Sequence, residues 1–383
     1  MRHVAFRERS LEEVKGTPRS ALFSLRRSHR AFGPLLRSHH WPWMTHYLRV
    51  AFRRRHHFPT YKADGSGSLG VFPLPDDPCT VAVAADWGTG TRSAYRVAEL
   101  IGHRNPEVTI HLGDIYYSGT PEEVNDFFLG PWPRGSKATY ALNANHEMYS
   151  GGTGYFDHVL PALKQHASYF ALQTLHWRIL ALDTGYSART FPLLELLNPS
   201  IHLPAETLEW LREVVFKDAT DRRPVVVLSH HQWFSAFDTE YAQIGRDLAP
   251  YLDKVLLWLW GHEHRFAAYA PASLDNLPRV RARCIGHGGM PTEIHRAPVR
   301  TSRPLVCIDD RKRTTVEGEP VGFCGFATLR FDGPSLTIAY VDEAGDILLE
   351  EAWTAGPPVS ALSVWASPKL RFMEGMTEAD LVK

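Results

Sequence analysis

Short runs of apolar residues recur along the chain from about residue 80, and segments with helical spacing lie between several of them. Runs without a polar face are typical of buried strands in a parallel sheet. We expect such strands at 80–85, 108–112, 140–142, 177–182, 225–228, 255–260 and 279–285. Spacing of about 3.6 residues predicts helices over 91–103 and 205–217, a helix start with an early proline at 121–124, and a helix around 248–252.

The pattern changes after residue 320, where apolar and polar residues alternate. The segments 326–331, 335–340 and 347–353 are separated by turn residues, which predicts an antiparallel meander. Since strands and helices alternate first and antiparallel strands close the domain, the predicted fold is a mixed α/β sandwich. We expect residues beyond about Ala355 to be attached to the surface or frayed.

The predicted organisation has three parts. They are a basic N-terminal extension with a linker (1–75), a catalytic domain (76–355) and a C-terminal tail (356–383). The Gly and Ser residues of 62–68 are typical of a flexible linker.

Charge is distributed unevenly. Residues 1–62 hold 14 Lys or Arg against 3 Glu, while the whole chain balances 42 basic with 42 acidic residues. The remainder is therefore acidic, which suits cation binding. Interleaved apolar residues in 1–62 predict helices with an apolar stripe and a cationic face. Three interpretations stay open: an arm packed on the main domain, attachment to an acidic membrane surface or partner, and contact with nucleic acid.

The four cysteines show no paired spacing and are too few for a disulfide framework, which favours a reducing compartment. No apolar run approaches the ~20 residues that cross a bilayer. The N-terminus also lacks the apolar core of a secretory signal. We expect a cytoplasmic protein, with peripheral membrane attachment as an option for the basic segment.

Polar side chains follow five of the predicted strands. In an open α/β sheet, ligands gather beyond the carboxyl ends of the strands, so residues far apart in sequence can converge. Carboxylate, amide and imidazole groups together suit iron, zinc or manganese, and an aspartate can bridge two cations. We interpret the set as a two-metal site. Its members are Asp86, Asp114, Asn145, His230, His262 and His264.

His262 and His264 are two residues apart, so on an extended strand they would point to opposite faces. The interpretation requires the chain to turn after residue 260 so that both face the ions.

These residues lie in motifs that resemble, in order, the five blocks of the calcineurin-like metallophosphoesterases, and more narrowly the purple acid phosphatase branch. The blocks are Asp86-Trp87-Gly88, Gly113-Asp114-Ile115-Tyr116-Tyr117, Asn145-His146-Glu147, the strand that ends at His230, and Gly261-His262-Glu263-His264. The match spans roughly residues 80–290. It implies a mixed-sheet αββα sandwich.

The resemblance also implies a ligand set. One metal would be held by Asp86, Asp114, Tyr117 and His264. The other would be held by Asp114, Asn145, His230 and His262, with Asp114 between the two.

Two departures from the common pattern bear on the metals. Gly88 stands where most of the superfamily has a histidine, and the purple branch compensates with a tyrosine, here Tyr117. A phenol has a pKa of about 10, so it binds as phenolate to a strongly acidic ion such as ferric iron. That predicts iron with a divalent iron, zinc or manganese. Alternatively, Tyr117 packs in the core and two divalent ions are bound. Ala144 replaces the glycine of the third block.

We assign further expected roles to four histidines. His146 is the expected catalytic residue, which would stabilise charge or protonate the leaving oxygen. His230 is preferred over His231 as the ligand, and His231 then lies behind the metals or faces substrate. His287 either contacts substrate or belongs to a structural turn. Glu147 and Glu263 are expected to hold their loops.

The predicted function is hydrolysis of phosphate mono- or diesters by a metal-bound hydroxide. Two alternatives are a metal-containing scaffold that its basic arm recruits to a membrane or partner, and a nuclease. Specificity is expected from a lid at 185–203 and from 301–321.

Overall fold

The computed structural model describes residues 54–61, 69–74, 78–188, 201–272, 278–290, 298, 300, 302–314, 320–356 and 358–382. The interpretations of residues 1–53 and of the linker at 62–68 concern residues outside this part. Residues 189–200 of the expected lid also lie outside this part.

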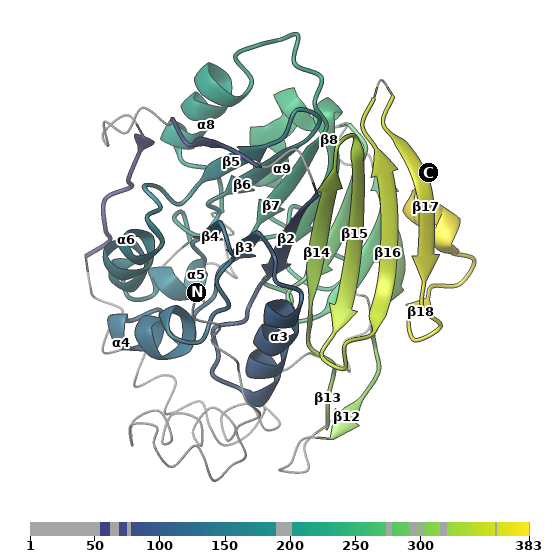
Figure 1. Cartoon of the computed structure of the whole chain (residues 1–383), viewed down its shortest axis with the longest axis horizontal. Helices are drawn as coiled ribbons and strands as arrows, with labels where there is room; N and C mark the ends of the chain where they lie inside the picture. Colours follow the sequence, from purple (N-terminus) through teal and green to yellow (C-terminus); the bar gives the residue numbers. More distant parts are fainter. Residues whose placement is uncertain are drawn as a thin grey trace.

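Two β-sheets pack face to face, and helices cover the outer face of each (Figure 1). One sheet has seven strands in the order β17-β16-β15-β14-β2-β3-β4, and the other has nine in the order β1-β5-β6-β7-β8-β10-β9-β11-β18. Apolar side chains from both sheets, such as Val83 and Leu228, form the core between them. This four-layer arrangement confirms the predicted αββα sandwich.

The seven-stranded sheet joins a parallel part to the antiparallel meander. Strands β2, β3 and β4 are parallel, and β14 is antiparallel to β2. Its strands are β2 (Cys79–Ala84), β3 (Val108–His111), β4 (Ala138–Ala141), β14 (Gly325–Asp332), β15 (Ser335–Asp342), β16 (Ile347–Thr354) and β17 (Ser360–Ala366). Its helices are α3 (Arg92–His103), α4 (Pro121–Val124) with η3 (Asn125–Leu129), α5 (Asn145–Met148), and η4 (Tyr155–Val159) with α6 (Leu160–Leu163).

The nine-stranded sheet has a parallel centre formed by β6, β7, β8 and β10. Its strands are β1 (Val71–Pro73), β5 (Phe170–Gln173), β6 (Arg178–Leu182), β7 (Val225–Ser229), β8 (Val255–Trp260), β9 (Phe266–Ala272), β10 (Val280–Ile285), β11 (Leu305–Ile308) and β18 (Arg371–Phe372). Its helices are α8 (Ala205–Trp210) with η5 (Leu211–Val215), and α9 (Ala242–Leu248) with η6 (Ala249–Lys254). A small hairpin joins β12 (Arg313–Thr314) to β13 (Pro320–Val321).

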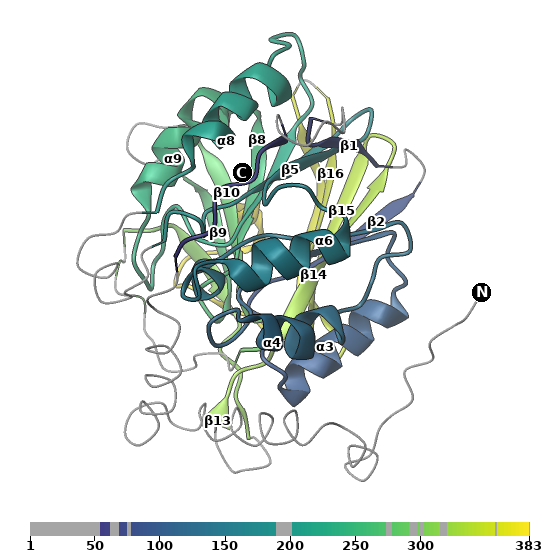
Figure 2. The same cartoon turned by 90° about the vertical axis from the view of Figure 1, so that its left-hand side faces the viewer.

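Helix α3 shows why the sequence periodicity was informative. Ala94, Val97, Ala98 and Ile101 are all buried, as their spacing predicts. Thr91 caps the helix, since its side chain accepts a hydrogen bond from the backbone of Ala94. The apolar face packs on the seven-stranded sheet, where α3, α4 and α6 lie together in Figure 2.

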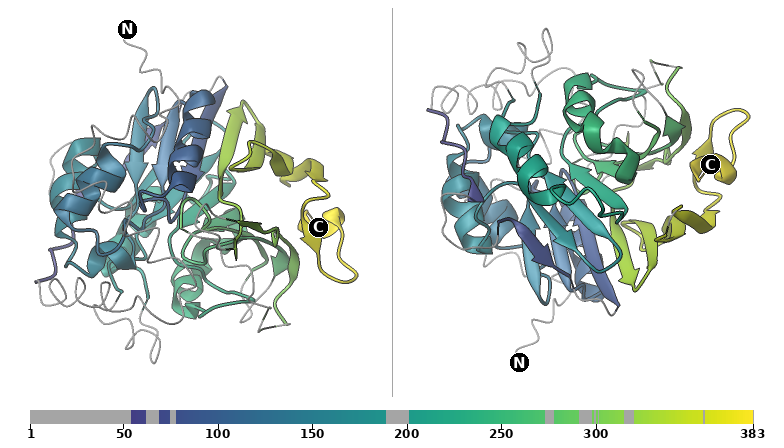
Figure 3. Two further views of the ribbon diagram at one scale, coloured as in Figure 1. Left: turned by 90° about the horizontal axis from the view of Figure 1, so that it is seen from below. Right: turned by 90° about the horizontal axis from the view of Figure 1, so that it is seen from above.

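The C-terminal segment differs from the expected tail. Strand β17 pairs with β16, and β18 pairs with β11 of the other sheet. The short helix η7 (Glu378–Leu381) follows, and the side chain of Leu381 is fully buried. The segment is therefore an ordered part of both sheets rather than a frayed end, on the side of the molecule where the C-terminus lies in Figure 3.

The segment 54–61 packs on the main domain. Tyr61 is 4% exposed, and its hydroxyl donates to the carbonyl of Tyr169 at 2.7 Å. Phe58 stacks on Tyr169 with ring centroids 5.5 Å apart. The guanidinium of Arg55 donates to the carbonyls of Tyr186 and Ala188. For these residues, the packed interpretation of the basic extension is favoured.

All four cysteines are buried, and none of them forms a disulfide bond. Within the part of the chain that the structure describes, no helix combines the length and hydrophobicity needed to cross a membrane.

Replacing Tyr61 with alanine is expected to destabilise the domain. The change removes a buried ring and a buried hydrogen bond, and comparable aromatic truncations cost about 3–5 kcal/mol. Tyr95→Ala is the control, because Tyr95 is 38% exposed. Urea unfolding measures both variants, and equal stability of Tyr61→Ala and the parent protein would contradict the packing of this segment.

Candidate metal centre

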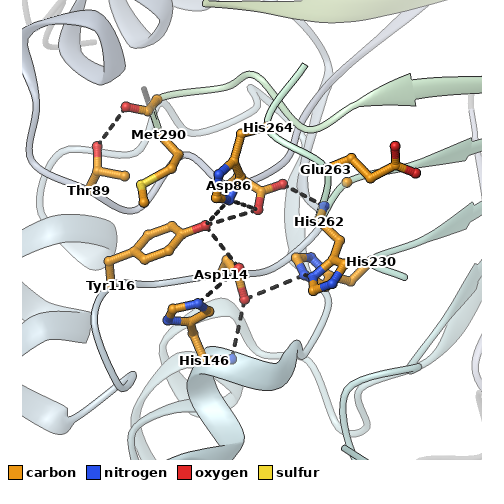
Figure 4. Close-up of polar contacts among 12 residues, drawn as sticks. Asp86, Thr89, Asp114, Tyr116, His146, His230, His262, Glu263, His264 and Met290 are labelled. Atoms are coloured by element: carbon orange, nitrogen blue, oxygen red, sulfur yellow. Dashed lines mark hydrogen bonds and ion pairs between the residues drawn. The ribbon is translucent and has the colours of Figure 1, made fainter. Parts of the chain in front are cut away.

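Five of the predicted ligands come together beyond the carboxyl ends of strands from both sheets: Asp86, Asp114, His230, His262 and His264 (Figure 4). Asp86 and Asp114 follow the neighbouring parallel strands β2 and β3. In the nine-stranded sheet, His230 follows β7 and His262 follows β8. These two strands are parallel neighbours. The backbone N–H of His262 donates to Oδ2 of Asp86 at 2.8 Å, which joins the two sheets at this point.

Asp114 lies at the middle of the cluster and presents its two carboxylate oxygens to different groups. Oδ2 accepts a hydrogen bond from the hydroxyl of Tyr116 at 2.9 Å. Oδ1 lies 3.5 Å from Nε2 of His230 and accepts from the backbone N–H of His146 at 3.3 Å. The carboxylate is 1% exposed. One side chain therefore connects two sets of donor atoms.

The first set surrounds the hydroxyl of Tyr116. That oxygen lies 3.0 Å from Oδ1 of Asp86 and 3.1 Å from Nε2 of His264. Nε2 of His264 is in turn 3.5 Å from Oδ1 of Asp86. Metal–ligand bonds of about 2.0–2.2 Å place adjacent ligands about 3 Å apart, so these separations match the spacing of ligands around one ion.

The second set contains two imidazoles. Nε2 of His230 lies 3.3 Å from Nδ1 of His262. Nδ1 of His230 is 3.1 Å from the carbonyl of Leu112, and because a carbonyl only accepts, this nitrogen carries the proton. Nε2 is then the atom free to bind a metal, an arrangement common among metal-binding histidines.

Asn145, the remaining predicted ligand of this set, immediately precedes His146, whose backbone N–H donates to Oδ1 of Asp114. The side chain of Asn145 is buried, and its Oδ1 has no hydrogen-bond partner among the described residues. Leaving a buried acceptor unsatisfied costs about 1–3 kcal/mol. A cation at this position would satisfy it, so the residues fit a pair of metal ions.

The loop after β8 turns both histidines toward the cluster. The N–H of Glu263 donates to the carbonyl of Gly261 at 2.7 Å, and the N–H of Arg265 donates to the carbonyl of Glu263 at 2.5 Å. These bonds close consecutive three-residue turns centred on His262 and His264. The turn that the sequence interpretation required is present.

Three of the predicted ligands have left-handed backbone conformations. The φ angles are +56° at Asp86, +72° at Asp114 and +65° at His262. Such angles are uncommon for residues other than glycine and concentrate at functional sites. They are independent support for a site at these positions.

Close approach between the loops depends on glycines. A Cβ on Gly261 would lie 2.6 Å from Cβ of Ala85 and 2.7 Å from Oδ2 of Asp86. A Cβ on Gly113, which has a φ of +98°, would lie 2.6 Å from Cβ of Ala144. The methyl group of Ala144 is accommodated because its neighbour across the gap is a glycine, and Ala144 itself has an extended backbone.

Charge and burial keep the cluster in a metal-binding state. Burial alone would raise the pKa of Asp114, but the nearby histidines and the Tyr116 hydroxyl lower it below its usual range. Burial, with His230, lowers the pKa of His262 to about 4. Burial and the neighbouring histidines also hold the pKa of His231 well below its usual value. At neutral pH the carboxylate is ionised and these two imidazoles are uncharged.

The hydroxyl of Tyr116, the residue before the predicted Tyr117, donates hydrogen bonds to Asp86 and Asp114. The backbone of Tyr117 instead donates to Glu123 at 2.7 Å and accepts from Nδ1 of His146 at 2.7 Å. The ring of Tyr117 packs beside Tyr116 and Met290. The sequence analysis named Tyr117 and not Tyr116, and the position of Tyr116 in the same motif was the available signal for its contacts with the cluster.

The contact with Tyr117 also identifies what orients His146. Because the Tyr117 carbonyl accepts, Nδ1 of His146 carries the proton and Nε2 faces Oδ2 of Asp114 at 3.7 Å. Glu147 is buried, and its Oε2 accepts from the backbone N–H of Asp114 at 3.3 Å, so it holds the loop as expected.

The remaining candidates differ in position. His231 lies beside His262, with ring centroids 4.7 Å apart, and its backbone N–H donates to the Thr184 hydroxyl at 3.0 Å. His287 is 1% exposed and packs against Phe266, and burial lowers its pKa to about 4. These contacts favour the structural-turn alternative for His287.

Comparison with known proteins agrees with this arrangement. Residues 79–266 match the model of the calcineurin-like phosphoesterase family. This part of the chain, just under half of its length, is similar to the calcineurin-like phosphoesterases. No curated protein sequence matches it.

Solved structures of this phosphoesterase fold include a purple acid phosphatase from yellow lupin, Lupinus luteus. The two are 15% identical with a TM-score of 0.50, over 74% of this chain and 55% of the lupin enzyme. The Plasmodium protein GAP50 is 10% identical with a TM-score of 0.46, over 80% of this chain and 93% of GAP50. PhoD is 12% identical with a TM-score of 0.46, over 80% of this chain and 75% of PhoD. The chain thus spans about half the length of the lupin enzyme.

Replacing Gly261 with alanine is expected to separate the loops that carry Asp86 and His262. Because the added methyl group overlaps Ala85 and Asp86, the free energy of unfolding should fall by about 1–3 kcal/mol. Gly102→Ala is the matched control, since a Cβ there meets nothing within 4 Å. In helix α3 that substitution should stabilise by about 0.5–1 kcal/mol.

Urea unfolding of the metal-free proteins measures both effects. Gly261→Ala with parental stability would show that the two loops do not approach as closely as described.

Proposed function

We propose that this protein is a dinuclear-metal phosphoesterase that hydrolyses phosphate mono- or diesters. The proposal is supported above all by Asp114, whose two oxygens lie against two separate sets of donors. The match of residues 79–266 to a phosphoesterase family model supports the reaction class.

The proposed ligands divide between two positions. One position has Asp86, Asp114, His264 and a tyrosine. The other has Asp114, Asn145, His230 and His262. A pair of cations held this way would lower the pKa of water and neutralise phosphate oxygens.

His146 is the proposed catalytic residue beside the metals. Its Nδ1–H bond to the Tyr117 carbonyl fixes the ring so that Nε2 faces the cluster. A protonated Nε2 can donate to a phosphate oxygen or to the leaving group, which is the role expected of a general acid.

The proposed tyrosine ligand is Tyr116 rather than Tyr117. Its hydroxyl is within 3.1 Å of Asp86, Asp114 and His264. Burial, with Asp114 and Asp86, holds the pKa of Tyr116 well above its ordinary value. A cation that binds it as phenolate must therefore be strongly acidic, and ferric iron is such an ion. We propose iron with a divalent iron, zinc or manganese.

Activity on simple esters tests the proposed function. Protein supplied with ferrous and manganous salts is expected to hydrolyse p-nitrophenyl phosphate or its bis ester. Asp114→Asn removes the shared carboxylate and should lower turnover on the order of 100-fold or more, with loss of bound metal. Asp332→Asn is the control, because its side chain, at the end of β14, is 57% exposed.

Two bound metals without turnover of either ester would contradict the enzyme proposal. That result would favour the metal-containing scaffold.

The visible spectrum of the iron-loaded protein tests the tyrosine. Phenolate bound to ferric iron absorbs visible light, so the parent protein should be coloured. Tyr116→Phe should lose this absorption, whereas Tyr117→Phe should keep it. If Tyr117→Phe loses the absorption and Tyr116→Phe keeps it, Tyr117 is the ligand. If the parent protein contains iron and is active but colourless, neither tyrosine binds the iron as phenolate.

A further inference from the structure

Asn145 can serve as a metal ligand only if its amide oxygen faces the cluster. Asparagine is not symmetric: the oxygen has lone pairs to offer a cation, whereas the NH2 group has only hydrogens. Rotation of the amide by half a turn would replace the ligand with a repulsive group. A neighbouring group must therefore fix the orientation of the Asn145 amide.

Tyr149 makes that contact. Nδ2 of Asn145 donates to the hydroxyl of Tyr149 at 3.0 Å. Tyr149 follows α5, so it lies one helical turn after Asn145, and its backbone N–H bonds to the carbonyl of Asn145 at 3.1 Å. The two side chains are thereby held on one face of the same turn.

The same ring also contacts His146, with centroids 4.9 Å apart. Tyr149 is 7% exposed, so its ring is fixed by packing and its hydroxyl cannot swing into solvent. A rigid acceptor behind the amide is what an orienting group requires.

We propose that Tyr149 is a positioning residue that aligns Asn145 for metal binding. Its hydroxyl accepts from the amide NH2, and Oδ1, the atom that would bind a cation, has no hydrogen-bond partner among the described residues. The inference rests on the proposed function, because it assumes that Asn145 binds the second ion.

The experiment compares manganese affinity by isothermal titration of the metal-free protein. The parent is expected to bind two ions. Tyr149→Phe keeps the ring and removes only the hydroxyl oxygen, and groups that orient metal ligands typically contribute 10–100-fold in affinity. We therefore expect one of the two ions to bind about 10–100-fold more weakly and the other to be unchanged.

Tyr155→Phe is the matched control. Tyr155 is fully buried and its hydroxyl donates to the carbonyl of Ala141 at 2.7 Å, so this variant also loses one buried phenolic hydrogen bond. Both manganese affinities should stay at the parental values. Thermal unfolding of each metal-free variant shows that it is folded.

A double-mutant cycle separates orientation from packing. In Asn145→Asp, a symmetric carboxylate offers an oxygen whichever way it is turned. Adding Tyr149→Phe to that variant should change the affinity by less than about threefold. A loss as large as in the asparagine background would mean that Tyr149 acts through packing, and the proposal would be overturned.

The outcomes also distinguish the two proposals. A parent that binds two ions and hydrolyses esters, with Tyr149→Phe unchanged in affinity, overturns the role of Tyr149 alone. A parent that binds two ions without hydrolysis, with the weakened second ion in Tyr149→Phe, retains that role and overturns the proposed function. A parent that binds a single manganese ion, with an affinity that Tyr149→Phe weakens, also retains that role, because the position with the tyrosine favours ferric iron. A parent that binds no manganese overturns both.

Discussion

A buried carboxylate between two sets of donors is the constraint on which the rest of the site depends. Removing the charge of Asp114 from water is unfavourable, and the surrounding imidazoles and phenol compensate for it. In return, each of its oxygens faces different partners: Tyr116 on one side and His230 on the other. The strands, turns and glycines around it serve to bring those partners within contact distance.

The two-sheet architecture explains how this is achieved. Parallel strands have their carboxyl ends at the same edge of a sheet. The segments after β2 and β3 therefore place two aspartates at this edge, and the segments after β7 and β8 in the opposing sheet place histidines beside them. The sheets could not approach at this edge without the glycine at 261 and the backbone bond from His262 to Asp86. Left-handed backbone at Asp86, Asp114 and His262 then turns each side chain inward. Core packing compensates for the local strain of these conformations.

Most of the strands and most of the candidate ligands could be predicted from the sequence, because they depend on local patterns. Apolar runs located the strands, and the polar residue after each run located most of the cluster. The alternation of 326–353 predicted β14 to β16. In contrast, β17 is mostly exposed and β18 has two residues, so neither carries a periodic signal.

Other features depend on tertiary contacts that no local pattern encodes. The contacts of the Tyr116 hydroxyl with Asp86 and Asp114 are an example, because residue spacing does not distinguish Tyr116 from the adjacent tyrosine. The turns that bring His262 and His264 to one side need hydrogen bonds that residue spacing does not show. The contact between Tyr149 and Asn145 could have been suspected from their spacing of four on a helix, but only the structure shows that the hydroxyl meets the amide.

The most direct test of the account is a crystal structure of the metal-loaded protein with anomalous scattering recorded at the iron and manganese edges. We expect two anomalous peaks about 3.5–4 Å apart, with one oxygen of Asp114 bound to each or one oxygen shared by both. A single peak, or two peaks with Asp114 bound to only one of them, would contradict the central role of this carboxylate.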